Sequence, residues 1–172
     1  MKPLSVRMIE AMVGKATYPY HDIDDNMDEW VKKAIVAART PFIQVVPVLS
    51  EKNYAGWKFT ITGDTVEDAI YLYDNLGKYL RTINQPFKIG TKKLITSASS
   101  EQKHKLLTIY VMKDTKVDYL LSDIKYYLKN YKCKAHLRWS EHVEGAIWKR
   151  VDRDEYGNYI PAYPSKGPMM VK

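Results

Sequence analysis

The clearest hydrophobic pattern begins in the middle of the chain. Residues 57–62 alternate between apolar and polar side chains, which is typical of a half-buried β-strand. Asp64 or Thr65 can then cap a helix that runs to about Ile83, and Pro86 follows it as a stop signal. The apolar residues of this predicted helix fall mostly three or four positions apart: Val66, Ala69, Ile70, Tyr73, Leu76, Leu80 and Ile83.

The same order of strand and helix returns further along. Residues 106–112 read as a strand, and Asp114 or Thr115 is expected to cap a second amphipathic helix. Between the two units, residues 87–89 and 93–96 predict a hairpin around Gly90, and 97–104 a polar loop. Further strands are predicted at 134–139, 147–151 and 159–162, the last two flanking a turn at 154–158.

The N-terminal region has a weaker pattern. Short helices are expected at 4–13 and 27–39, a loop at 15–26 and a strand at 42–49. Together the elements predict an α+β fold: a mainly antiparallel sheet with two helices on one face, plus an N-terminal helical segment. We expect one domain over 1–172, with a core at 56–163, an N-terminal region at 1–55 and an extended tail at 164–172.

Composition and net charge restrict the kinds of partner that we expect for the chain. The chain has 172 residues and a formal net charge of +7, which favours anionic partners such as phosphate groups or nucleic acid. Its one cysteine, Cys133, cannot form an intrachain disulfide, and no apolar run approaches the ~18 residues of a membrane span. The N-terminus lacks an apolar core of signal-peptide type, so we expect a cytoplasmic protein without membrane association. There is no phosphate-binding Gly-rich loop, HExxH, CxxC or GxSxG motif, and no metal or cofactor is predicted.

Five segments, in order, resemble one known family. They are GWKFTIT at 56–62, PFK at 86–88, KLLTIY at 105–110, HLRW at 136–139 and VDRDE at 151–155 with Gly157 and the IPA of 160–162. Their order and spacing are similar to those of the N-terminal lyase domain of class III and class IV lanthionine synthetases, which is related to phosphothreonine lyases of pathogenic bacteria. The resemblance spans about Gly56 to Ala162, and nothing in the first 55 residues matches.

The resemblance implies elimination of phosphate from phosphothreonine or phosphoserine, without a metal. A base must remove the proton on Cα, an acid should protonate the departing oxygen, and cations must hold the phosphate dianion. The family places a Lys-x-His pair on its first strand, and here the pair is Lys58 and Thr60. Period 2 puts both on one face, but a hydroxyl cannot act as an acid near neutral pH as imidazole does. We therefore expect weak or absent elimination, and binding of a phosphoprotein, phosphopeptide or other polyanion.

The remaining roles follow from the same resemblance. Lys88 corresponds to the general base, while Lys105 and Arg138 correspond to phosphate contacts. Such a base must be partly neutral, so it needs burial or cationic neighbours that lower its pKa. His104 is the best candidate for a substitute acid, and the other histidines are His21, His136 and His142.

Two other functions compete with this one. Cations interleaved with aromatic rings suit RNA or another single-stranded nucleic acid, and they gather in one stretch: Lys125, Tyr127, Lys129, Tyr131, Lys132, Lys134 and Trp139. The same residues also suit an ordinary amphipathic helix with lysines at its C-terminus. A third possibility is a protein-binding inhibitor or adaptor that uses the unmatched first 55 residues, where Trp30 and Ile35 lie near several acidic residues.

Overall fold

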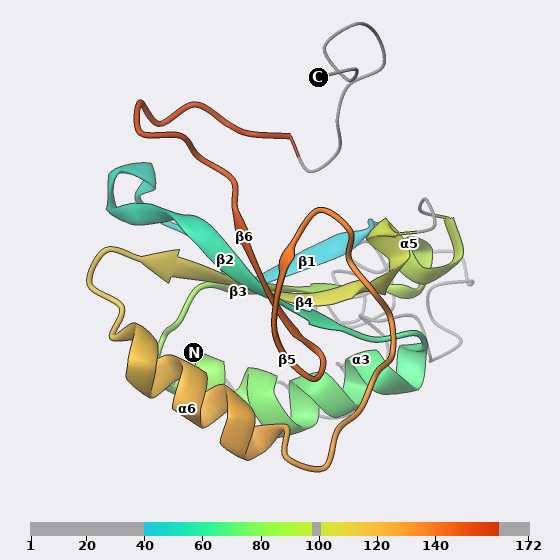
Figure 1. Ribbon diagram of the computed structural model, residues 1–172. Coiled ribbons are helices and arrows are strands. Elements are labelled where there is room, and N and C mark those ends of the chain that lie inside the picture. The colour runs from blue at the N-terminus through green and yellow to red at the C-terminus, as the bar shows by residue number, and fades with distance from the viewer. Residues whose placement is uncertain (1–39, 98–100, 162–172) are drawn as a thin grey trace, which may run out of the picture.

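The computed structural model describes residues 40–97 and 101–161, and these form a six-stranded antiparallel sheet with helices (Figure 1). The strands lie side by side in the order β1-β3-β4-β2-β6-β5. Their bounds are β1 Phe42–Val46, β2 Tyr54–Thr62, β3 Phe87–Gly90, β4 Lys105–Met112, β5 Glu141–Glu144 and β6 Ile147–Val151. The predicted α+β class and the mainly antiparallel sheet are confirmed.

Two long helical segments lie on the same side of the sheet (Figure 1). The first comprises α3 (Val66–Leu72), a π-helical turn η3 (Tyr73–Gly77) and α4 (Lys78–Thr82), and the second is α6 (Val117–Tyr127). Thr65 caps α3 through a reciprocal capping box with Asp68, as the sequence predicted for this position. The shorter helices are α5 (Lys92–Ser97) and the 3₁₀ turns η2 (Glu51–Asn53) and η4 (Gln102–His104).

Alternation along the strands gives the sheet one apolar face. Ile61 in β2 pairs with Leu107 in β4 and Ile147 in β6, and Phe59 pairs with Ile109 in β4. These five residues are buried in one hydrophobic cluster with apolar residues of both helical segments. The apolar face therefore faces the helices and holds most of the core.

The opposite face carries polar residues in a row that crosses all six strands. Cα pairing runs from Gln44 through Lys88 to Thr108, then through Thr60 and Trp148 to His142. A second row beside it contains Tyr110, Lys58 and Arg150. Because paired residues in an antiparallel sheet share a face, the Lys58 and Thr60 pair and the Lys88 side chain meet on this surface.

A bulge brings a further lysine to the polar face. Thr62 pairs with Lys105, whereas Ile61 pairs with Leu107, so Leu106 is the extra residue between them. Strict alternation from Thr108 would turn Lys105 toward the helices. The bulge instead puts Lys105 on the same face as Thr62 and Thr60.

Four predicted features are wrong. In the described part of the strand predicted at 159–162, Tyr159 makes only an isolated bridge with Arg153. Residues 93–96 form part of helix α5 and not a hairpin arm, because β3 is already paired on both sides, with β1 and β4. Residues 134–139 form no strand, since β5 occupies the edge of β6 and the Arg138 N–H donates to the Glu101 carboxylate. Lys116, without a side-chain cap, precedes α6 in place of Asp114 or Thr115.

Several expectations concern residues outside those described. They include the helices at 4–13 and 27–39, the loop at 15–26 and the tail at 164–172. Among the described residues, no helix has the length and apolar character needed to span a membrane.

Candidate functional site

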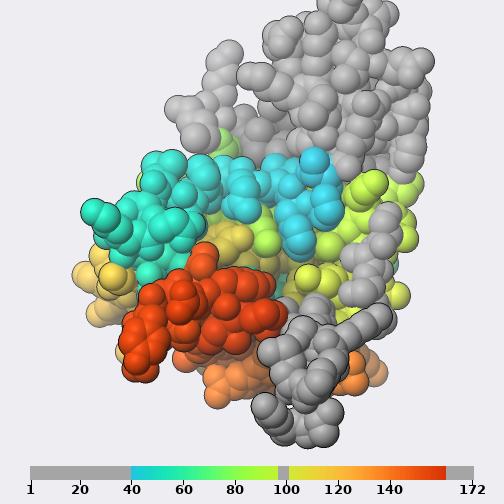
Figure 2. Space-filling model, turned by 90° about the horizontal axis from the view of Figure 1, so that it is seen from above, coloured from blue at the N-terminus to red at the C-terminus, as the bar shows by residue number. Residues whose placement is uncertain are grey.

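A cavity of about 430 Å³ opens on the polar face of the sheet. Its floor and walls come from four strands and from the segments after β1 and β6: Gln44, Pro47, Val48, Glu51, Tyr54, Lys58, Lys88, Tyr110, Asp152, Arg153 and Tyr159. Figure 2 looks onto this face and shows the blue-green atoms of β1, η2 and the start of β2 opposite the red atoms that follow β6. Residues that are distant in sequence thus enclose one site.

Lys58 is held at the cavity by a buried carboxylate. Its ammonium lies 3.2 Å from the Asp152 carboxylate, and the two side chains are only 16% and 7% exposed. The Tyr54 hydroxyl donates a 2.6 Å hydrogen bond to the other oxygen of Asp152. Burial and this hydrogen bond raise the pKa of Tyr54 well above its usual value, so its hydroxyl stays protonated. Asp152 therefore fixes two cavity residues at once.

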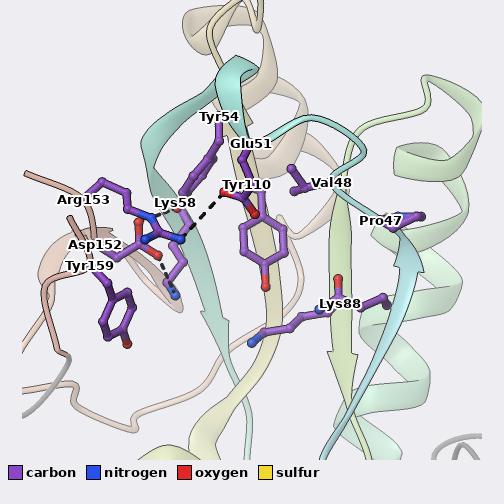
Figure 3. Close-up of a pocket in the computed structure, with 11 residues that line it drawn as sticks. Pro47, Val48, Glu51, Tyr54, Lys58, Lys88, Tyr110, Asp152, Arg153 and Tyr159 are labelled. Atoms are coloured by element: carbon purple, nitrogen blue, oxygen red, sulfur yellow. Dashed lines mark hydrogen bonds and ion pairs between the residues drawn. The ribbon is translucent and has the colours of Figure 1, made fainter. Parts of the chain in front are cut away.

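Lys88 enters the cavity from strand β3, which β4 separates from β2 (Figure 3). Its ammonium lies 3.9 Å from the centroid of the Phe42 ring and 5.9 Å from that of Tyr110. Burial lowers the pKa of Lys88, and the weaker effects of Tyr159 and Asp152 oppose that change. A lysine in this environment loses its proton more easily than a surface lysine does.

Lys105 and Arg150 lie near these two lysines. Burial and the positive charges of Arg150, Lys58 and Lys88 together lower the pKa of Lys105 to about 8, while Glu101 opposes them. Arg150 is 6% exposed, and its guanidinium donates to the Ile160 carbonyl. Four cationic side chains therefore influence one another on this face, and the sheet register brings Lys58 and Arg150 side by side.

Thr60, which the family resemblance predicts to stand where the general acid would be, is buried on the same face. Thr60 is 2% exposed, and its strand partners on this face are Thr108 and Trp148. His104, the predicted substitute acid, lies near the end of β2 instead. One of its ring nitrogens is 2.8 Å from the Asp64 carboxylate, and His104 does not line the cavity. Its position close to Asp64 and Gly63 separates it from the Lys58 and Lys88 ammonium groups.

The other two histidines that the structure describes, His136 and His142, also lie outside the cavity lining. The rings of His136 and His142 both contact Trp148, at centroid distances of 5.1 and 4.5 Å. His21 lies outside the described residues. In the described ranges, no group of three or more His, Cys, Asp or Glu side chains is arranged to hold a metal ion.

The predicted phosphate contact Arg138 lies elsewhere. Arg138 is exposed, its guanidinium lies 5.5 Å from the Trp139 ring, and it is not part of the cavity lining. Arg150 on β6 occupies the place near Lys58 that we had expected Arg138 to fill. The alternation of Trp148 and Arg150 with their neighbours in 147–151 was the signal for this, because it puts both on the same face as Thr60.

The predicted nucleic-acid residues divide into two groups. Tyr127 packs against Tyr79, and Tyr131 stacks on Tyr71 and donates a 2.6 Å hydrogen bond to the Thr62 carbonyl. The rings of Tyr127 and Tyr131 therefore pack within the fold. Four lysines of the stretch and one ring are exposed: Lys125, Lys129, Lys132, Lys134 and Trp139.

Comparison with known proteins gives no relative. No protein-family model matches the chain, and no curated protein has a significantly similar sequence. The function has to be argued from the site alone.

Proposed function

We propose that this protein binds a phosphorylated ligand at the polar face of its sheet, with Lys58 and Lys88 as direct contacts. The observation that carries the proposal is the grouping of Lys58, Lys88 and Arg150 around Lys105, on whose pKa all three charges act. Asp152 pairs with Lys58 and Glu101 acts on Lys105, but these two carboxylates stand against four cations, so positive charge is in excess among these groups. A phosphate dianion would supply charge of the opposite sign and accept hydrogen bonds from several of these donors.

Elimination is the reaction for which the proposed site is partly equipped. Lys88, when neutral, would take the proton from Cα, the Cβ–O bond would break, and phosphate would leave against the cations. In the part of the chain that the structure describes, no histidine lies where it could protonate the leaving oxygen, because Thr60 takes the position of the acid and His104 lies by Asp64. General acid catalysis is worth about 10²–10⁴-fold, so elimination should be weak or absent while binding is kept.

Binding is tested with orthophosphate and a phosphothreonine peptide by calorimetry at low salt. Lys58→Met and Lys88→Met should each weaken binding by about tenfold, because each removes a charge-assisted contact. Lys78→Met is the matched control, since Lys78 on α4 is exposed and pairs with Asp74 of η3. Unchanged affinity in both cavity variants, or no binding by the unaltered protein, would refute the proposal.

Elimination is tested by mass spectrometry of the same peptide after incubation. The unaltered protein should release little phosphate, and Thr60→His should raise the release by restoring an acid near Lys58. The variant must keep its melting temperature and its orthophosphate affinity for the comparison to count. A correctly folded, phosphate-binding Thr60→His variant without any gain would argue against an inherited lyase site.

Single-stranded nucleic acid is the second candidate, and one surface favours it. Lys125, Lys129 and Lys132 line a groove of about 230 Å³ beside the β5–β6 turn, with Glu144 opposite. The Lys129 ammonium lies 4.7 Å from the ring of Tyr126, which is 62% exposed. RNA binding that weakens steeply with salt, and that is lost in Lys125→Glu with Lys132→Glu but kept in Lys88→Ala, would favour this candidate.

A further inference from the structure

The cavity is larger than a phosphate group requires. Its volume of about 430 Å³ lies within the range of about 300–1,000 Å³ that is usual for pockets holding drug-sized organic ligands. A water molecule takes about 30 Å³, and a phosphate group is only a few times larger. Most of the space is therefore left for the group that carries the phosphate.

Tyr54, Tyr110 and Tyr159 contribute aromatic rings to the lining of this space. Tyr110 stands with its ring centroid 6.0 Å from the Lys58 ammonium and 5.9 Å from that of Lys88. Its ring packs edge-on against Tyr54, at 5.8 Å between centroids, and Tyr54 is tied to Asp152 by its hydroxyl. The Tyr110 ring is thus supported from behind by a residue that is itself fixed.

Tyr159 provides a second ring on the other side of Lys58 (Figure 3). The guanidinium groups of Arg150 and Arg153 lie 5.6 and 5.7 Å from its centroid. Pro47 and Val48 complete the apolar part of the lining. Ammonium groups at the base and aromatic rings at the sides match the two ends of an aromatic phosphate monoester.

We infer that the cavity selects a phosphate monoester whose organic part contains a planar aromatic group, such as phosphotyrosine or a mononucleotide, over phosphothreonine. The inference rests on the proposed function and narrows its ligand. The aromatic group lies against Tyr110 and Tyr159, while the phosphate reaches Lys58 and Lys88. Glu51 and Asp152 also line the cavity, and each already has a cationic partner, Arg153 at 3.7 Å and Lys58 at 3.2 Å.

This ligand class also fits the threonine in the position of the acid. The carbon that bears the oxygen in an aryl phosphate belongs to the ring, and no neighbouring sp³ carbon offers a proton for β-elimination. The phosphate of a mononucleotide likewise lacks an acidic proton on the neighbouring carbon. A site that holds such ligands needs cations and stacking surfaces, but it needs no general acid.

The test compares four probes by calorimetry: orthophosphate, N-acetyl-phosphotyrosine amide, N-acetyl-phosphothreonine amide and adenosine 5′-monophosphate. Phosphotyrosine amide, the nucleotide or both should bind about tenfold more tightly than phosphothreonine amide, since ring stacking adds to the phosphate contacts. The aromatic probe that binds more tightly indicates whether the ligand is a phosphotyrosine or a nucleotide.

Two variants test whether the rings of Tyr110 and Tyr159 cause the preference for aromatic ligands. Tyr110→Leu and Tyr159→Leu should each reduce the ratio of the affinity for the aromatic probes to the affinity for phosphothreonine amide, and an unchanged circular dichroism spectrum shows that each variant is folded. Tyr156→Leu is the matched control, because Tyr156 is 81% exposed in the neighbouring turn and does not line the cavity. Equal affinity for the aromatic and threonine probes would overturn this inference and leave phosphate binding standing. Failure of all four probes, orthophosphate included, would overturn the proposed function itself.

Discussion

At the scale of single residues, Asp152 has the largest structural role in the site. It follows β6, is 5% exposed, and accepts from the Tyr54 hydroxyl while pairing with Lys58. A carboxylate in this position compensates a buried ammonium and fixes its direction. Removing the Asp152 carboxylate would leave the buried Lys58 ammonium and the Tyr54 hydroxyl without their partner. Each of these losses lowers the stability of the folded protein.

Asp152→Ala should therefore lower the free energy of unfolding by about 3 kcal/mol in the absence of ligand. Asp74→Ala is the control, because the Asp74–Lys78 pair is about half exposed and its loss should cost less than about 1 kcal/mol. Urea denaturation of both variants at neutral pH measures the difference. Equal losses in the two variants would show that Asp152 does not stabilise the site in this way.

At the scale of elements, the long helix before β3 contains a π-helical turn at Tyr73–Gly77. Gly77 lies at its end, where a Cβ would come 2.8 Å from the Tyr73 ring and 3.4 Å from the Phe87 ring. Both aromatic residues are buried against the sheet. The close approach of the helix to β3 at this point thus depends on the missing side chain.

Gly77→Ala should destabilise the protein by about 1–3 kcal/mol, because overpacking outweighs the better helix propensity of alanine. Ser122→Ala, at an exposed position of α6, should be neutral or slightly stabilising. Thermal unfolding followed by circular dichroism compares the two. A gain in stability for Gly77→Ala would contradict this prediction, because it would show that the Tyr73 and Phe87 rings can move aside without destabilising the core.

The pairing of the elements also decides how much of the fold and of the site could be predicted from the sequence. Strands β2 and β4 and the two long helical segments follow local periodicity, which a sequence displays directly. The hairpin predicted at 93–96 failed because pairing is decided by which edge is vacant, and β1, some 50 residues away in the chain, already occupies that edge of β3. Arg150 was overlooked as a member of the site, although its strand was predicted, because its proximity to Lys58 depends on the order of β6 and β2.

At the scale of the whole molecule, the polar face of the sheet groups positively charged side chains at buried positions. Burial there disfavours the charged form of a lysine. The pKa of Lys105 is lowered to about 8 by burial and by Arg150, Lys58 and Lys88, and that of Lys88 is lowered mainly by burial. An unperturbed lysine side chain in a model peptide has a pKa of about 10.4. The charge of the site is therefore more sensitive to pH than the charge of the protein surface.

Orthophosphate affinity should fall as pH rises from about 7.5 to 9, because Lys105 loses its proton across this interval while surface lysines remain charged. Stability should change in the opposite direction. A lysine whose folded-state pKa lies below its unfolded value binds fewer protons in the folded state, so the free energy of unfolding rises with pH between about 8 and 10.5, by at most about 1.4 kcal/mol per pH unit for each such lysine.

Lys105→Gln should bind orthophosphate more weakly and flatten both pH profiles, whereas Lys78→Gln, at an exposed position on α4, should leave them unchanged. Calorimetry across pH 7.5–9 and urea denaturation across pH 8–10 supply the two profiles. A rise in affinity over the first interval would contradict a role for Lys105 as a charge that attracts the ligand. Loss of stability over the second would contradict the burial of its ammonium group, since an exposed or well-paired lysine would show no such gain.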